Sequence, residues 1–332
     1  MKKQSIILVI VLAAVGFILW RQHPSQRIAT AAANDDNFTA HTDEPIEPLP
    51  RSISLDERKV SLGEQLFNES QLSHDNTISC ASCHSLNKGG TDQLKKSVGV
   101  NGQTGDVNSP TVLNAAYNFK QFWDGRAETL EEQVEGPIQN PKEMASVWSE
   151  VIEKLNRSSQ YARQFAAVYP NGLNRESIKD AIATYERSLI TPDSKFDRYL
   201  RGEEQALSAE EKRGYRLFKE YGCSSCHQGT AVGGNLFEKF GVMNSEGRGN
   251  SKADLGRFNV TGLEKDKFVF KVPSLRNVEL TAPYFHDGSA DTLDAAVKTM
   301  TRFQLGRSLS DSDLEDIVRF LKTLTGSQRP KQ

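Results

Sequence analysis

Two strings of the form C-x-x-C-H, at residues 80–84 (CASCH) and 223–227 (CSSCH), constrain this chain more than any other feature. The pattern is typical of covalent c-type haem attachment, in which two thiols bond the vinyl groups of one porphyrin and the adjacent histidine faces the iron. The chain has four cysteines, so none remains for a disulfide, a zinc site or a thiol nucleophile. The predicted haem-attachment residues are Cys80, Cys83, His84, Cys223, Cys226 and His227.

Length and composition add few constraints. A chain of 332 residues is long enough for about two domains that each bury a core. A hydrophobic content of 37% and a charged content of 25% are ordinary for a soluble globular protein. A formal net charge of −2 gives no reason to expect nucleic acid as a partner.

The N-terminus has the pattern of an export segment. Lys2 and Lys3 precede an uncharged apolar run over residues 6–20, which Arg21 follows. The candidate cleavage motif at residues 29–31 lies far beyond this run, which favours an uncleaved anchor in the inner membrane over a cleaved signal. Either form of a segment over residues 1–22 predicts export to the periplasm, where covalent haem attachment also takes place.

The remaining chain is predicted to form a flexible tether followed by two related domains. Residues 23–53 are polar and show no sustained periodicity, which indicates a tether. A capping-box pattern begins at Ser54 and predicts the first helix. The string G-x-x-L-F precedes both haem strings, at residues 63–67 and 214–218, which indicates a duplicated haem domain. The predicted domains are 54–191 and 192–328.

Most periodic segments predict helices. Apolar residues recur at three- and four-residue spacing, and the best strand pattern, over residues 268–272, is short. The predicted fold class is therefore mostly α, with two cytochrome c-like haem domains, many loops and very little strand. The predicted helices cover residues 144–155, 175–189, 209–220, 292–302 and 311–323.

Spacing alone does not identify the second axial ligand of either iron. The histidines outside the haem strings are His23, His41, His74 and His286. The first two lie in the predicted tether, which leaves His74 and His286 as candidates. Beyond Met1, three methionines offer thioether ligation, which would raise the potential of a haem and close it to small ligands. These are Met144, Met243 and Met300.

Several further motifs resemble the bacterial di-haem cytochrome c peroxidases. They are FWDGRA at residues 122–127, Gly136-Pro137, Glu143-Met144, VPSLRN at residues 272–277 and YFHDG at residues 284–288. The resemblance covers about residues 55–324, with both haem strings in register. It implies that the N-terminal haem, with His84 as proximal ligand, reacts with hydrogen peroxide. It also implies that the C-terminal haem, ligated by His227 and Met300, receives electrons from a small reduced cytochrome c or copper protein.

The resemblance also implies roles for four residues near the peroxide site. Glu143 matches a carboxylate that shuttles a proton between the peroxide oxygens, and Gln133 matches an amide that holds the bound oxygen. Phe122 is expected to pack over the same pocket. Trp123 matches an aromatic residue between the two haems, where it fills the interface and is a candidate electron relay.

A calcium site between the domains is a further implication. The matching positions are Asn108, Thr281 and Pro283, which would supply side-chain amide and backbone carbonyl oxygens. Oxygen ligands suit calcium, although the chain contains no acidic calcium-loop motif. Members of the family are commonly dimers, so a homodimer is also an expectation.

The chain departs from the family at one position. Many members have a histidine sixteen residues after the proximal histidine, and it ligates the resting peroxidatic iron. Val100 occupies that position here, and valine cannot ligate iron. We therefore expect an open, high-spin first haem. His74 is the alternative ligand, although a surface or hydrogen-bonding role is favoured for it. For His286, a hydrogen bond to a propionate or the backbone is favoured over ligation.

Two other functions compete with a peroxidase. One is oxidation of a protein or organic substrate, as in the related methylamine-utilisation maturation enzymes. An open first haem favours this function. Those enzymes have tyrosine at the position of Met300, so the methionine argues against this reading. The other is a non-enzymatic electron carrier, which would require both irons to be closed.

Overall fold

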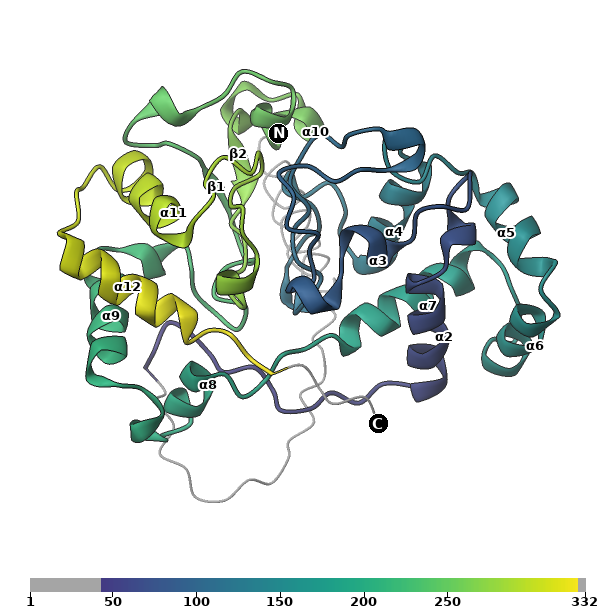
Figure 1. The fold of residues 1–332 in the computed structure, drawn as a ribbon, viewed down its shortest axis with the longest axis horizontal. Coiled ribbons are helices and arrows are strands. Elements are labelled where there is room, and N and C mark those ends of the chain that lie inside the picture. Colours follow the sequence, from purple (N-terminus) through teal and green to yellow (C-terminus); the bar gives the residue numbers. More distant parts are fainter. Residues whose placement is uncertain (1–42, 328–332) are drawn as a thin grey trace, which may run out of the picture. The chain divides into compact units, whose positions relative to one another are not determined.

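The computed structural model describes residues 43–327, so the predicted export segment and most of the predicted tether lie outside it. The described chain is mostly helical, as the sequence predicts (Figure 1). Within residues 43–327, no helix combines the length and apolar character needed to cross a membrane. The helices are α2 (Glu57–Phe67), α3 (Cys80–Cys83), α4 (Leu130–Gln139), α5 (Trp148–Asn156), α6 (Ser159–Val168), α7 (Arg175–Ser188), α8 (Lys195–Leu200), α9 (Ala209–Glu220), α10 (Phe258–Thr261), α11 (Leu293–Thr299) and α12 (Asp311–Lys322).

The strand content of the described residues is one short antiparallel pair. Strand β1 (Phe237–Lys239) pairs with β2 (Val269–Lys271), so that Phe237 lies opposite Lys271. Strand β2 falls within the predicted strand at residues 268–272, and the fold-class prediction is confirmed.

Two hydrophobic cores form around the two copies of G-x-x-L-F. In the first copy, α2 packs on α7, and in the second, α9 packs on α12 (Figure 1). A Cβ atom at Gly63 would overlap the carbonyl oxygen of Ala181, and one at Gly214 would overlap that of Asp316. The glycine of each repeat therefore allows two helices to approach closely, and the phenylalanine of each repeat, Phe67 or Phe218, is buried.

The second core also contains a segment that the sequence places in the tether. Ile46 and Leu49 are 2% and 0% exposed, and Ile46 packs with the helices of the C-terminal domain. The backbone N–H of Leu49 donates to Asp197 at 3.1 Å. The prediction of a flexible tether through residue 53 is therefore wrong for residues 45–50, because two apolar side chains in a polar stretch find a distant apolar surface.

Two helices begin later in the chain than the sequence predicts. Helix α2 begins after Asp56, whose side chain accepts the N–H of Arg58, and not at Ser54. The helix predicted from residue 144 begins only at Trp148. The preceding loop instead turns back on α4, where the N–H groups of Met144 and Ser146 donate to carbonyls near the C-terminal end of that helix.

Candidate haem centres

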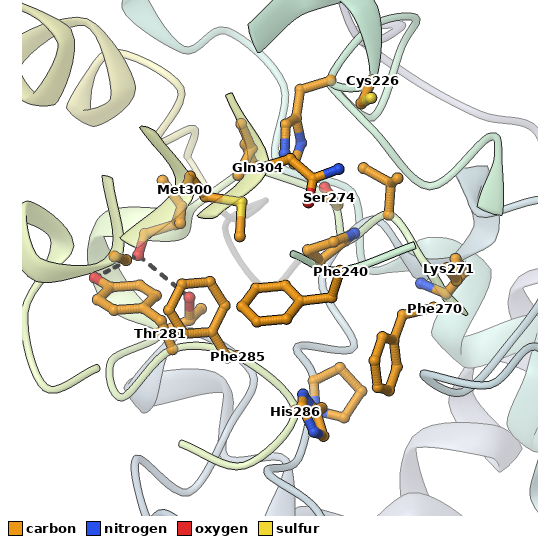
Figure 2. Close-up of a pocket in the computed structure, with 18 of the residues that line it drawn as sticks. Cys226, Phe240, Phe270, Lys271, Ser274, Thr281, Phe285, His286, Met300 and Gln304 are labelled. Atoms are coloured by element: carbon orange, nitrogen blue, oxygen red, sulfur yellow. Dashed lines mark hydrogen bonds between the residues drawn. The ribbon is translucent and has the colours of Figure 1, made fainter. Parts of the chain in front are cut away.

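The second haem string lies in a cavity with a candidate axial ligand on another wall. Cys223 begins a short 3₁₀ turn (Cys223–Ser225), and the cavity lining includes Cys226 and His227. The lining also contains Met300, at the start of a π-helical turn (Met300–Gln304) after α11. Figure 2 shows the Met300 sulfur directed into the cavity. Burial lowers the pKa of His227 to about 4, which keeps the imidazole neutral, as an iron ligand requires.

The other methionines of the described residues lie elsewhere. Met144 is 2% exposed and packs in the core of the N-terminal domain. Met243 is 63% exposed. Of the three methionines that spacing left open, the structure thus brings Met300 alone to the cavity of the second haem string.

The first haem string forms α3 and the residue that follows it. His84 is the C-cap of α3, and its Nδ1 donates to the backbone carbonyl of Gly90 at 3.2 Å. That hydrogen bond fixes the tautomer and leaves Nε2 available as a ligand. Burial lowers the pKa of His84 as well. The four thiols are free, so the residues at both strings fit covalently attached c-type haems.

Two of the residues predicted for the peroxide pocket, Phe122 and Gln133, lie against or on α4, and Phe122 also belongs to the lining of the second string's cavity. The ring of Phe122 packs over Gly136 of α4, where a Cβ atom would lie 2.7 Å from the ring. The guanidinium carbon of Arg126 lies 3.4 Å from the centre of the same ring. Gln133 is on α4, one turn before Gly136. Phe122 has a φ of 68°, in the left-handed region that a phenylalanine rarely adopts, so the backbone is strained at the residue that positions this ring.

Glu143 carries a partly buried carboxyl group. Its Oε1 accepts a hydrogen bond from Asn140 Nδ2 at 2.6 Å. Burial raises the pKa of Glu143, while the Asn140 hydrogen bond and the charge of Arg126 oppose that rise. The charge of Glu143 in turn contributes to the raised pKa of the Cys83 thiol, so this carboxyl lies near the first attachment string.

The loop that carries Val100 is held against the Glu143 segment. Val100 is 1% exposed, and its N–H donates to the carbonyl of Glu143 at 2.8 Å. A Cβ atom at Gly99 would overlap the carbonyl oxygen of Lys142, so only glycine allows this approach. Lys142 Nζ also pairs with Asp106 at 2.6 Å.

The structure places His74 away from a ligating role. Its side chain is 63% exposed, and Nδ1 lies 3.1 Å from the carboxylate of Glu150. The predicted surface or hydrogen-bonding role of His74 is confirmed. His286 also forms a hydrogen bond, as predicted, but its partner is the carboxylate of Asp254 at 2.8 Å and not the backbone.

Trp123 and Asn108 connect the two domains. Trp123 Nε1 donates to the Asn108 carbonyl at 2.9 Å, and the Asn108 N–H donates to the His286 carbonyl at 2.7 Å. The carbonyl of Trp123 accepts the N–H of Lys271, on β2, at 2.8 Å. Trp123 itself belongs to the lining of the second string's cavity, and these hydrogen bonds hold it there.

The three predicted calcium-site residues belong to the lining of that cavity. They are Asn108, Thr281 and Pro283. Asn108 Nδ2 donates to the carbonyl of Leu94 at 2.8 Å, which orients the amide. Amide and backbone carbonyl oxygens suit calcium, and the calcium site stays a prediction.

Two residues near these centres, Arg126 and Lys271, were not predicted from the sequence. Arg126 stands in the FWDGRA string, but an arginine beside an aspartate there predicts only a solvated ion pair. Lys271 lies in the predicted strand, where the alternation of side chains gave no reason to expect a buried cation.

Comparisons with known proteins agree with the arrangement of two haem strings. Residues 57–205 match the profile of the family described as di-haem cytochrome c peroxidase, and residues 211–325 match that described as cytochrome c. The chain is 51% identical over 300 residues to cytochrome c peroxidase Ccp of Escherichia coli. That match covers 90% of this chain and 64% of the relative, so the chain spans less than two thirds of that protein.

Two other comparisons cover more of the matched protein. Cytochrome c551 peroxidase of Nitrosomonas europaea is 49% identical over 287 residues, which is 86% of this chain and 85% of the relative. Among solved structures, a MauG-like protein associated with microbial copper homeostasis matches with a TM-score of 0.74 and 28% identity. The match covers 88% of this chain and 96% of that protein.

Proposed function

Because the chain belongs to the di-haem cytochrome c peroxidase family, we propose that it reduces hydrogen peroxide to two molecules of water. The reaction consumes two protons and two electrons. A small reduced cytochrome c or copper protein supplies the electrons one at a time. The observation that carries the proposal is that different side chains lie near the two haem strings. A partly buried carboxyl group, Glu143, lies near the first string, whereas the second string shares its cavity with Met300.

Glu143 is the group that moves the proton. When bound, the first haem supplies the iron at which peroxide is reduced. Glu143 accepts a proton from one peroxide oxygen and returns it to the other, so that the second oxygen leaves as water. Burial raises the pKa of Glu143, which brings it closer to neutral pH and favours transfer in both directions. The Asn140 hydrogen bond at 2.6 Å holds the carboxyl in place for this exchange.

Gln133 and Phe122 complete the pocket. The amide of Gln133 orients the substrate oxygen from α4. Phe122 covers Gly136 of the same helix and keeps bulk water away from the reacting oxygens. Arg126, stacked on that ring, balances the charge of the Glu143 carboxylate after it has lost its proton.

Electrons enter at the C-terminal centre and leave through the interface. His227 and Met300 are the residues that would ligate the second iron, which would close it to peroxide and raise its potential. Trp123 would be the large side chain between the centres, held by its hydrogen bonds to Asn108 and Lys271. Asn108, Thr281 and Pro283 would hold a calcium ion at the same interface.

The first haem is open to peroxide in the oxidised protein. Val100 occupies the position of the histidine that blocks this iron in many family members, and its side chain is buried beneath the Glu143 segment. We therefore infer that no reduction step is needed before peroxide binds. Donor and substrate meet the protein in the periplasm, to which the segment over residues 1–22 directs it.

A second candidate function is oxidation of a protein or organic substrate, which the MauG-like structural relative and the open first haem favour. The methylamine-utilisation enzymes have tyrosine at the position of Met300, and here the Met300 sulfur is directed into the cavity of the second string. Peroxide reduction is therefore the better supported of the two.

Steady-state turnover tests the proposal. The as-isolated ferric protein is mixed with reduced cytochrome c and hydrogen peroxide, and oxidation of the cytochrome is followed with and without prior reduction of the enzyme. We expect turnover of two cytochromes per peroxide under both conditions. Absence of turnover under both conditions would exclude a peroxidase, and turnover only after reduction would exclude the open first haem.

A further inference from the structure

Lys271 is a buried cation in the cavity of the second haem string. Its residue is 6% exposed, although it lies on β2, a strand of the two-stranded sheet. The cavity lining contains Lys271, His227 and Met300, and Figure 2 labels Lys271 and Met300. Lys271 therefore lines the space that is predicted to hold the second haem.

Other buried cations of the described residues have carboxylate partners, and Lys271 differs from them. Arg276 pairs with Asp197 at 2.7 Å, and Lys179 pairs with Glu135 at 2.8 Å. No hydrogen bond or ion pair of the Lys271 ammonium is found among residues 43–327. An ammonium group buried without a partner is strongly disfavoured, so a protein keeps one where a ligand supplies the anion.

Among residues 43–327, no carboxylate pairs with the Lys271 ammonium group. Burial is the sole cause that lowers the pKa of Lys271, to about 8, and no carboxylate raises it again. Glu238 is the acidic residue in the same lining, and its Oε1 accepts the backbone N–H of Lys239 at 2.8 Å. An anion that pairs with the Lys271 ammonium group would therefore have to come from a bound ligand.

A haem carries two propionates, which are anions of the right kind for this position. We propose that Lys271 pairs with a propionate of the second haem and thereby raises the reduction potential of that haem. The proposal rests on the assignment of this cavity to the second haem. A positive charge close to the ring, and the neutralisation of a propionate, both disfavour the ferric iron relative to the ferrous iron.

The location of Lys271 links this charge to electron transfer between the centres. Its backbone N–H donates to the carbonyl of Trp123 at 2.8 Å, so the residue that sets the charge also contacts the residue between the haems. Lys271 is a positioning residue in this role. It touches neither peroxide nor the first iron, and it acts through the potential of the electron-transfer haem.

Potentiometric titration of the holoprotein, followed at the absorption bands of both haems at pH 8, tests the proposal. Two neutral variants, Lys271→Met and Lys271→Gln, are compared with Lys271→Arg and with the exposed control Lys265→Met. Both neutral variants should shift the ferric-to-ferrous equilibrium of the second haem toward ferric by about tenfold, which is 59 mV for one electron. Lys271→Arg and Lys265→Met should remain within about threefold of the parent protein.

The outcomes separate this proposal from the assignment of the cavity. If the parent protein lacks the spectrum of a His/Met haem, the cavity assignment itself is wrong. If that spectrum is present but both neutral variants keep the parent potential, the pairing is overturned. A shift confined to the first haem would overturn it too, because the lysine would then serve the other ring.

Discussion

The backbone N–H of Val100 donates a 2.8 Å hydrogen bond to the backbone carbonyl of Glu143. The loop that carries Val100 thus supports the segment of the carboxyl group that we propose as the proton shuttle. The side chain of Val100 is buried and cannot ligate iron, so this loop contributes packing.

The first prediction concerns the resting state of the first haem. Because Val100 cannot ligate iron and His74 is exposed and bonded to Glu150, the as-isolated ferric protein should contain one high-spin and one low-spin haem. Electron paramagnetic resonance at low temperature distinguishes the two. Two low-spin signals, one of them typical of bis-histidine ligation, would show that another group closes the first iron.

The second prediction concerns Glu143. Glu143→Gln keeps the size and the Asn140 contact but cannot shuttle a proton, so kcat should fall by about 10²- to 10⁴-fold. The spin states of both haems should not change. Glu153→Gln, on the exposed face of α5, is the matched control and should keep full activity. Equal activity of the two variants would remove Glu143 from the mechanism.

The third prediction concerns the ligand of the second iron. Met300→Ala should abolish the near-infrared absorption typical of His/Met ligation. It should also lower the potential of that haem on the order of 100 mV, within the roughly 0.8 V range that axial ligands span. Met243→Ala removes the same side chain from a position that is 63% exposed, and it should leave spectrum and potential unchanged. If Met300→Ala kept both, the thioether ligand would have to be sought elsewhere.

The fourth prediction concerns the repeated glycines. Gly63→Ala forces a methyl group against the Ala181 carbonyl, and should lower the free energy of unfolding by about 1–3 kcal/mol through overpacking. Gly105→Ala is the control, because the nearest atom to its Cβ would lie at an ordinary 3.6 Å. Urea denaturation of both variants measures the difference. A Gly63→Ala variant as stable as the control would show that the α2–α7 pair can separate without cost.

The fifth prediction concerns Glu186, on α7. Its Oε2 is buried without a hydrogen-bond partner, and burial raises its pKa to about 8. The folded protein therefore holds a proton that the unfolded chain releases above about pH 4.5. Stability should consequently fall as the pH rises from about 4.5 to 8.

Glu186→Gln should remove this decline. We expect it to raise the free energy of unfolding at pH 8 on the order of 3 kcal/mol relative to the parent protein, with little difference at pH 4.5. Urea denaturation at both pH values measures this, with Glu153→Gln as the exposed control. An equal gain at both pH values would point to packing and not to the proton.

The sequence predicted the parts of the fold that depend on neighbours along the chain. Helix α9 begins and ends at the predicted residues, because Ser208 caps it and its apolar residues recur at helical spacing. Helix α4, by contrast, was missed, since Gly136 and Pro137 interrupt its pattern. The helix forms nonetheless because Leu130, Val134 and Ile138 are buried on its inner face.

The candidate site also combines features that the sequence predicts with features that it does not. The two haem strings are contiguous in the sequence, so the sequence alone predicts haem attachment. Met300 lines the same cavity as His227, Glu143 lies near Cys83, and Lys271 contacts Trp123, although the members of each pair lie far apart in the sequence. Such contacts leave no periodic signal, so they followed from family resemblance or, for Lys271, were seen only in three dimensions.

The packing of Ile46 and Leu49 on the C-terminal domain has a consequence for how the chain folds as it is made. Leu49 contacts Asp197, and the Glu47 carbonyl accepts from Arg276 at 2.9 Å, so contacts span about 150 to 230 residues. Synthesis produces this segment early and its partner surface late. The C-terminal domain is therefore completed only after the N-terminal domain has emerged, and the long loop closure should make that last step the slow one.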